Sequence, residues 1–299
     1  MFKSEELVEK HRNKSKVYCA EKLIFGGVED YDVYNISAPF ELNHQLILAG
    51  RVEARDSEHS QIRFFYHKSG NQWQLIDEAQ SFNLQDPFFT RIDEKIILGG
   101  VEVTFDGEKV LYWRTIFYEL NDLKNAKLIF SGPMGMKDIR LRELANGKIL
   151  VLTRPQGVRG GLGKIGVVVI DDLSKLSIDL LEKAPLLKNQ YVDEEWGGAN
   201  EIHLVGNRVA VLGHIGSRDY LGNIHYRAMT FELDENFTEI LNPKIIAERK
   251  DFVAGPSKRP DLMDVVFSGG LIFKEDKVVL YAGTGDAEAQ KLVIDDPFR

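Results

Sequence analysis

The sequence predicts an all-β fold, in which residues 1–299 form a single five-bladed β-propeller domain closed by N-terminal strands that join the last blade. Three observations predict this fold. A hairpin motif recurs five times, its copies lie about 50 to 60 residues apart, and strand-like segments fill the intervals. Helical periodicity occurs only near the N-terminus, in SEELVEKHRNK.

Each copy of the motif has a short strand, a polar turn and an aliphatic run that ends near Gly, Arg or His. The turns read LNHQ, IDEK, ANGK, VGNR and KEDK, and their Asn, Asp and Gly residues suit hairpin loops. The five copies begin at Ala38, Asp86, Lys137, Ala199 and Val266.

Segments between the copies, such as KVLYWRTIFYELND and KIGVVVIDDLSKLSID, each indicate two outer strands of a blade joined by a turn. The last copy ends soon after VVLYAGTGDAEAQKLVI, whereas VYCAEKLIFGGVEDYDVYNI precedes the first copy and is rich in strand formers. We therefore expect the N-terminal segment to close the ring, since closure removes exposed sheet edges. A pair of two-sheet β-sandwiches is the alternative fold.

Composition excludes several classes of function. The net charge of −8 disfavours nucleic acid as a partner, because phosphate neutralisation requires a basic face. The chain has no apolar run of the roughly 18 to 20 residues that span a bilayer and no apolar secretory signal, so we expect a cytoplasmic protein without a membrane partner. The single cysteine, Cys19, excludes an intrachain disulfide and a thiolate zinc site, and we expect no metal.

Charged residues recur at the ends of the hairpin strands, in register with the repeats. Because the inner strands of a propeller line its channel, these side chains are expected to converge on one end of that channel. Such a polar pocket suits a small polar ligand, and Trp196 offers an aromatic face on which a sugar could stack. The residues are Arg51, Glu53, Asp86, Glu102, Lys137, Asp138, Arg154, Glu195, His214, Asp264 and Asp286.

The segments RVEARDSEHSQI, QDPFFTRI, KDIRL with NGKILVLTRP, VLGHIG, and VFSGGLI with VVLYAGTGD resemble the blade motifs of glycoside hydrolase family 130. The resemblance covers nearly the whole chain and implies a five-bladed propeller that cleaves β-mannosides with inversion, by phosphorolysis or hydrolysis. The sequence is closer still to the domain-of-unknown-function family 1861, a propeller group.

The resemblance implies roles for individual residues. Asp86 would be the general acid, and Arg154 and His214 would hold phosphate. Independently of the resemblance, we expect Trp196 and Asp264 to bind substrate. We also expect Glu195 to be a carboxylate that could activate water in a hydrolase. The resemblance places the remaining substrate-binding residues at Arg51, Glu53, Lys137, Asp138 and Asp286.

The sequence departs from the family pattern at three positions near these residues. Gln85 stands where the family has an acid, Phe88 where it has an arginine, and Thr153 where it has a histidine. Arg159, Arg218 and Arg227 are candidates to supply the missing positive charge. The stretch GVRGGLGKIG lacks the lysine-serine ending of a phosphate-binding loop and is interpreted as a flexible hairpin tip.

The leading hypothesis is an inverting glycosidase or glycoside phosphorylase that acts on an oligosaccharide or glycoside, with no cofactor and with inorganic phosphate as a co-substrate. The alternative is a non-catalytic glycan-binding propeller, which the three departures favour. A protein scaffold and a calcium-dependent lactonase or phosphodiesterase propeller are further alternatives, although no clustered ligand motif indicates calcium.

Overall fold

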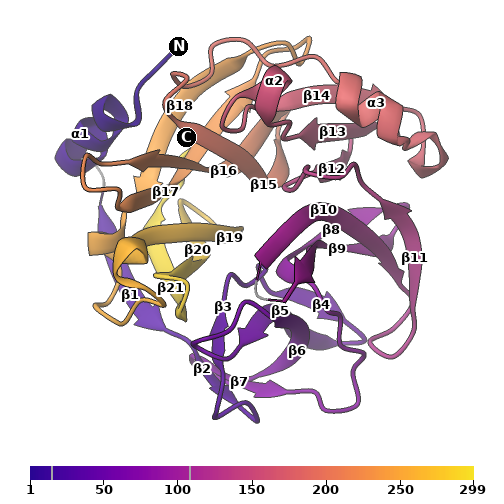
Figure 1. The fold of residues 1–299 in the computed structure, drawn as a ribbon, viewed down its shortest axis with the longest axis vertical. Helices are drawn as coiled ribbons and strands as arrows, with labels where there is room; N and C mark the ends of the chain where they lie inside the picture. Colours follow the sequence, from indigo (N-terminus) through magenta and orange to yellow (C-terminus); the bar gives the residue numbers. More distant parts are fainter. Residues whose placement is uncertain (15, 108) are drawn as a thin grey trace.

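The computed structural model describes residues 1–14, 16–107 and 109–299, and most of these residues lie in strands. The prediction of an all-β fold is confirmed. Five groups of mainly antiparallel strands surround a common centre in the described part of the chain (Figure 1). No helix in these residues has the length and apolar character needed to cross a membrane.

The first two groups come from the N-terminal half of the chain. Group one contains β2 (Ile24–Gly26), β3 (Asp32–Tyr34), β4 (Phe40–Leu42), β5 (Gln45–Glu53), β6 (Ser60–Ser69) and β7 (Gln72–Leu75), with β2 parallel to β7. Group two is a four-stranded meander of β8 (Gln85–Ile92), β9 (Lys95–Asp106), β10 (Lys109–Leu120) and β11 (Ala126–Ser131).

Group three has three strands, β12 (Arg140–Glu143), β13 (Ile149–Thr153) and β14 (Gly166–Ile170), with the short helix α2 (Gly157–Gly160) between the last two. The sequence analysis was wrong about a further strand in LSKLSID. That segment forms the 3₁₀ helix η1 (Leu173–Lys175) and the start of α3 (Ile178–Lys183). The hydroxyl of Ser177 accepts a hydrogen bond from the backbone of Leu180, a helix N-cap that favours the helix over a strand.

Groups four and five share one sheet through a short parallel pairing of β17 with β19. Group four contains β15 (Trp196–Val205), β16 (Arg208–Arg218), β17 (Ile224–Leu233) and β18 (Ile240–Ala247). Group five contains β19 (Asp264–Lys274), β20 (Lys277–Thr284), β21 (Glu288–Asp295) and β1 (Val17–Lys22), and the 3₁₀ helices η2 (Arg249–Asp251) and η3 (Pro260–Leu262) lie between the groups.

The core is divided among the interfaces between consecutive groups. Phe88 and Phe117 of group two pack with Ile139 and Val151 of group three, for example. Similar clusters join groups one and two, three and four, and four and five. A fifth cluster includes Ala289 of β21 with residues of group one, so the apolar contacts run around the whole ring.

The two ends of the chain meet in group five. β1 pairs antiparallel with β21, and Cys19 lies directly opposite Val293. Before β1, helix α1 (Ser4–Lys14) occupies the predicted N-terminal position and packs at the rim beside β18 (Figure 1). His11 and Arg12 of α1 bind Asp251 and Glu248, respectively, which fixes the helix to the segment after β18.

Strands β8, β12, β15 and β19 contact one another near the centre of the ring. Residues at the starts of these strands therefore approach a shared space, although they come from positions far apart in the sequence. This arrangement places several of the predicted polar residues in reach of one pocket.

The pairing of β1 with β21 can be tested with a disulfide. In Val293→Cys, the new thiol lies opposite Cys19, and opposed residues of antiparallel strands have Cα atoms close enough to be bridged. Oxidation should produce a fast-migrating species on a non-reducing gel and stabilise the fold by about 3–5 kcal/mol, because the bond closes a very long loop.

Lys291→Cys is the matched control, since Lys291 is opposite Glu21 and therefore lies diagonally from Cys19. It should cross-link far more slowly. Equal cross-linking of both variants, or of neither, would contradict the observed register.

Candidate active site

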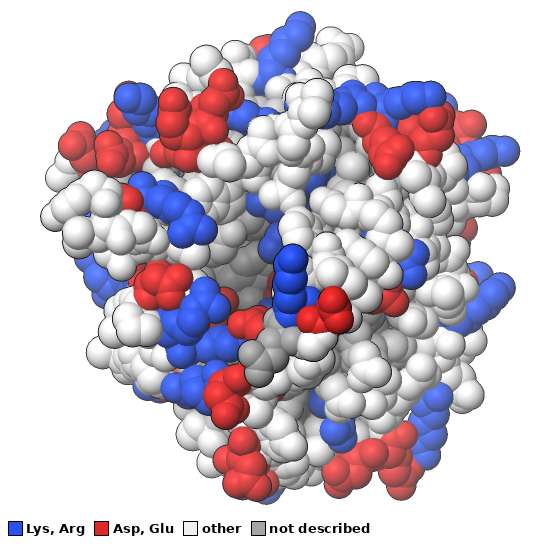
Figure 2. Space-filling model, in the orientation of Figure 1, with Lys and Arg blue, Asp and Glu red and all other residues white. Residues whose placement is uncertain are grey.

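A pocket of about 210 Å³ opens near the centre of the ring. Figure 2 shows the face hollowed at its centre, with basic and acidic side chains close together around the hollow. We call this cavity the central pocket. It is lined by Asn35, Arg51, Glu58, Gln85, Asp86, Lys137, Tyr226, Lys258, Arg259, Leu262, Phe267 and Asp286.

The backbone that presents these residues is irregular at equivalent places in the ring. Asn35, Asp86 and Asp138 all have positive φ angles, of 42°, 51° and 59°, just before or within the inner part of groups one, two and three. Asn and Asp tolerate this left-handed conformation better than other side chains. Strained residues of this kind cluster at functional sites. Here they lie directly after β3, at the second residue of β8 and two residues before β12.

Asp86 is held by two donors from group one. Its Oδ1 accepts hydrogen bonds from Nδ2 of Asn35 at 2.8 Å and from Nη1 of Arg51 at 3.2 Å. Its Oδ2 makes no hydrogen bond to the residues that the structure describes. The carboxyl group is therefore oriented through one oxygen and has the other available for a ligand.

Arg51 is the centre of a buried network. Its guanidinium binds the carboxylate of Glu53 at 2.6 Å and the hydroxyl of Ser60 at 2.9 Å as well as Asp86, and only 5% of the residue is exposed. Lys258, from the segment between η2 and η3, binds the other oxygen of Glu53. Charges that are removed from water need such partners, so the network fixes the geometry of the pocket wall.

Asp286 lines the same pocket in a different electrostatic environment. Burial, with a smaller contribution from the carboxylate of Asp86, raises the pKa of Asp286 to about 6, although Arg51 and Lys258 act in the opposite direction. Asp286 therefore binds a proton at a higher pH than an ordinary carboxyl group does. Two carboxyl groups in unlike environments are typical of acid–base sites.

Lys137 is half-buried and lines the pocket without a hydrogen bond or ion pair to any described residue. The other lysine, Lys258, is bound by both Glu53 and Glu58. Arg259 is bound by Asp261 and lies 3.5 Å from Glu58. Lys137 is thus the lining cation whose charge is least neutralised by direct partners.

Arg154 and His214 lie outside the pocket wall, with 2% and 1% of each residue exposed. Nε of Arg154 donates to the carbonyl of Gly197, and Nδ1 of His214 donates to Oδ1 of Asn200. Burial lowers the pKa of His214 to about 3 despite the nearby carboxylate of Asp138, so the imidazole is neutral. Their predicted contact with phosphate stays a prediction, since neither residue lines the central pocket.

Asp138 joins Arg154 and His214 in this layer. Its Oδ2 lies 3.4 Å from Nη1 of Arg154 and 3.9 Å from Nε2 of His214, yet neither of its carboxylate oxygens has a hydrogen bond among the described residues. Nη1 of Arg154 also lacks one. Buried polar groups are normally paired, so these atoms indicate room for a water molecule or a polar ligand group below the central pocket.

Four predicted residues lie elsewhere. Glu102 accepts a hydrogen bond from Nε of Arg114 and does not line the pocket. Both carboxylate oxygens of Glu195 accept hydrogen bonds from the backbone N–H of Ser4, the first residue of α1, and Oε1 also accepts one from the Ser4 hydroxyl. Glu195 therefore anchors the N-terminal helix and does not line the pocket. Trp196 is 8% exposed and donates to the hydroxyl of Tyr226, so it positions a lining residue. Asp264 binds His225 outside the pocket.

The structure also places several unpredicted residues in the pocket. Asn35 occupies the position in group one that Asp86 occupies in group two, and its place before a hairpin strand could have indicated it. Lys258 and Arg259 lie in a loop that carries no motif, so no signal in the sequence identified them, whereas Glu58 lies within the motif RVEARDSEHSQI but was not singled out. Arg159, Arg218 and Arg227 do not line the pocket, and Arg159 binds backbone carbonyls at the end of α3.

Comparisons with known proteins agree with this architecture. The family described as "Protein of unknown function (DUF1861)" matches residues 9–299. No curated protein matches the chain. The chain is 29% identical to MPT-4, a mannose phosphorylase from Leishmania mexicana solved in complex with phosphate ion, with a TM-score of 0.92 over 99% of this chain and 93% of that one.

Two further structures are informative. MPT-1, a GDP-Man-dependent mannosyltransferase from Leishmania mexicana, is 30% identical, with a TM-score of 0.89 over 98% of this chain and 94% of that one. A β-1,2-mannobiose phosphorylase from Listeria innocua shares 19% identity and a TM-score of 0.66, over 89% of this chain and 91% of that one, which shows similarity of fold alone. The predicted resemblance to the domain-of-unknown-function family 1861 is confirmed by the family match. The predicted resemblance to glycoside hydrolase family 130 is confirmed at the level of the fold.

The raised pKa of Asp286 predicts a pH-dependent stability. Because Asp286 binds its proton more tightly in the folded chain than in the unfolded one, its contribution to stability is lost as pH rises from about 4 to about 6. Asp286→Asn cannot ionise, so it should match the wild type at pH 4 and exceed it by on the order of 2–3 kcal/mol at pH 8. Denaturant unfolding at both pH values measures the difference.

Asp77→Asn is the matched control, because Asp77 is an exposed carboxylate outside the central pocket. It should change stability equally little at both pH values. A constant difference between Asp286→Asn and the wild type across this range would show that the pKa of Asp286 is ordinary.

The structural role of Glu195 is tested by Glu195→Gln. The amide keeps one acceptor but loses the charge that binds Ser4, and hydrogen bonds to charged groups contribute about 1–3 kcal/mol, so the free energy of unfolding should fall by that amount. Turnover of a substrate should persist below the lower melting temperature. Loss of turnover with unchanged stability would restore a catalytic role for Glu195.

Proposed function

The chain belongs to the family described as "Protein of unknown function (DUF1861)", and from this membership and its pocket we propose that it is an inverting mannoside phosphorylase. Its five strand groups would form a five-bladed propeller, with the central pocket as the active site. The observation that carries the proposal is the pocket itself, in which Asp86, Asp286 and the unneutralised Lys137 face one small cavity. The 29% identity to a mannose phosphorylase supports the class of substrate.

The carboxyl pair provides the proton. Burial and the neighbouring carboxylate of Asp86 raise the pKa of Asp286 to about 6, so Asp286 keeps a proton up to a higher pH than an ordinary carboxyl group does. We assign Asp86 as the group that delivers this proton to the glycosidic oxygen, as the family resemblance implies. Asn35 and Arg51 fix its orientation for that step.

Phosphate would then act as the nucleophile. One of its oxygens bonds to the anomeric carbon from the face opposite the leaving group, while the bond between that carbon and the glycosidic oxygen breaks. The leaving oxygen keeps the electron pair and takes the proton from the acid. The products are a mannosyl phosphate of inverted configuration and a mannoside shorter by one residue.

Lys137 is the residue that we propose to bind this phosphate directly. It is the cation that lines the pocket without an acidic partner among the described residues. Asp138 attracts Lys137 without a direct ion pair, and Arg154 and His214 interact with the same carboxylate. Arg154 and His214 would therefore support the anion site from beneath.

The departures from the family pattern leave positive charge at the centre of the ring. The guanidinium of Arg140 stacks on the ring of Phe88 at 3.6 Å, so an arginine from the next group occupies the space beside the lost family arginine. Arg140 and Phe88 line a different cavity and not the central pocket, so this cation lies outside the proposed active site. Cation–π contacts of this kind are stabilising when they are buried.

A second candidate function is mannosyl transfer from a sugar nucleotide. The 30% identity to a GDP-Man-dependent mannosyltransferase favours it. The same carboxyl groups could serve both reactions, with a nucleoside diphosphate in the place of phosphate. The central pocket of about 210 Å³ favours the smaller anion.

Asp86→Asn tests the assignment of the acid. Removal of general acid catalysis should lower turnover of β-linked manno-oligosaccharides by at least about 100-fold, while the melting temperature stays within a few degrees of the wild type. The activity is measured as the amount of mannosyl phosphate formed in reactions with and without inorganic phosphate, which chromatography quantifies.

Asp171→Asn, an exposed carboxylate on the outer side of group three, is the control and should retain full activity. Normal turnover by Asp86→Asn would refute the assignment. Equal cleavage without phosphate would indicate a hydrolase, and consumption of GDP-mannose without phosphorolysis would indicate the transferase.

A further inference from the structure

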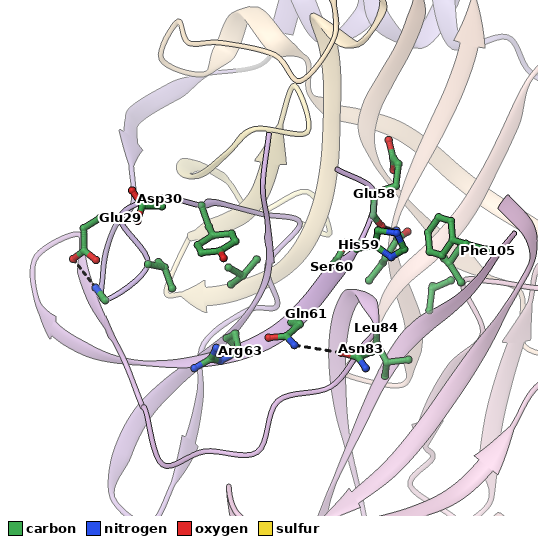
Figure 3. Close-up of a pocket in the computed structure, with 17 residues that line it drawn as sticks. Glu29, Asp30, Glu58, His59, Ser60, Gln61, Arg63, Asn83, Leu84 and Phe105 are labelled. Atoms are coloured by element: carbon green, nitrogen blue, oxygen red, sulfur yellow. Dashed lines mark hydrogen bonds between the residues drawn. The ribbon is translucent and has the colours of Figure 1, made fainter. Parts of the chain in front are cut away.

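A second cavity of about 590 Å³, nearly three times the volume of the central pocket, lies beside it. We call it the side pocket. Its walls come from the loop between β2 and β3, the start of β6, the residues that lead into β8, and the part of β9 near Phe105. Figure 3 shows His59 and Phe105 at one end, Glu29 and Asp30 at the other, and Gln61, Arg63 and Asn83 between them.

The two cavities share part of their walls. Glu58 and Gln85 line both, and Nε2 of Gln85 donates to the backbone carbonyl of Glu58 at 3.1 Å. Gln85 directly precedes Asp86, the proposed acid. A chain of sugar residues with its reacting bond at Asp86 would therefore pass Gln85 and enter the side pocket.

The polar lining of the side pocket suits a ligand with many hydroxyl groups. Gln61 and Asn83 present side-chain amides 3.3 Å apart, and both residues are exposed. Ser60 and the half-buried Gln85 add further polar side chains nearby. Amides and hydroxyls both donate and accept, which is what sugar hydroxyls require.

Aromatic rings provide a complementary surface. The rings of His59 and Phe105 lie 4.5 Å apart between centroids, with His59 exposed and Phe105 half-buried. Tyr31, 56% exposed, lines the pocket as well. Rings that are kept at a solvent-facing wall by their neighbours are suited to stacking against the apolar face of a sugar.

The charge of the lining argues against a nucleotide in this cavity. Glu29, Asp30 and Glu58 oppose the single guanidinium of Arg63, so the described lining carries a negative balance. A nucleoside diphosphate carries at least two negative charges and would be repelled. A neutral oligosaccharide meets no such penalty.

From these features we infer that the side pocket binds the non-reacting residues of a longer mannoside and makes the enzyme selective for chain length. The inference rests on the proposed function, because it takes the central pocket as the place of reaction. β9 and β10 each have twelve residues, and this long hairpin carries Phe105 to the cavity. The hairpin therefore provides one wall of the length-selecting site.

The test compares kcat/KM for β-linked manno-oligosaccharides of two to six residues in the presence of phosphate. In the wild type, kcat/KM should rise with length beyond the disaccharide. In His59→Ala and Phe105→Ala, the ratio of kcat/KM for the longest to the shortest substrate should fall roughly three- to tenfold, the equivalent of one aromatic contact. The loss should be in KM, because these rings do not touch the reacting atoms.

His67→Ala is the matched control. His67 lies farther along β6, and its ring contacts the ring of Trp73. The substitution therefore removes a comparable aromatic contact outside the side pocket. Its length ratio should equal that of the wild type. Stability of each variant is measured by thermal unfolding, so that a folding defect, which would lower kcat/KM equally for all lengths, is recognised.

Binding of the same oligosaccharides by calorimetry separates this inference from the proposed function. If the chain turns over none of them but binds longer ones more tightly, and His59→Ala weakens only that gain, the proposed function fails and the side pocket stands. If turnover occurs with an unchanged length ratio in both aromatic variants, the inference is overturned while the proposed function stands. The inference would also be overturned if GDP competed with oligosaccharide binding in the wild type and no longer did so in His59→Ala.

Discussion

The buried guanidinium of Arg51 joins three parts of the ring. It comes from β5 of group one, binds Asp86 of group two, and is linked through Glu53 to Lys258, which precedes group five. A charge so deeply buried is costly unless every partner is in place, so the network permits one arrangement of the three segments. The geometry of the central pocket depends on that arrangement, and so does the orientation of the proposed acid.

The buried network around Arg51 also accounts for the different polar groups that line the central pocket and the side pocket. Arg51 and Asn35 use one oxygen of Asp86, whereas Asp286, which lacks such close donors, has its pKa raised by burial. One carboxyl group is thus oriented, and the other binds a proton up to a higher pH than an ordinary carboxyl group does, which suits the proposed reaction. The wall beyond Gln85 carries amides and aromatic rings instead of paired charges, and this composition suits recognition without reaction.

Sequence patterns predicted the strands well, because alternation and turn residues are local properties. They also identified Arg51, Asp86, Lys137 and Asp286, since these residues recur at the ends of hairpin strands and such ends converge in a ring. They failed for Glu195, whose partner Ser4 lies 191 positions away, and for Lys258, which a loop without a motif delivers to the pocket. Long-range pairing and loop paths leave no periodic signal, so only the three-dimensional arrangement reveals them.

The pairing of β1 with β21 also affects how the chain acquires its structure. Val17 pairs with Ile294, so β1 cannot find its partner until Ile294 has been synthesised. Contacts of such large sequence separation slow folding, and in the meantime the unpaired β1 is open to association with other chains. Since Lys258 and Asp286 also come late in the sequence, an incomplete chain has no central pocket. Completion of the central pocket and pairing of β1 therefore become possible at nearly the same stage of synthesis.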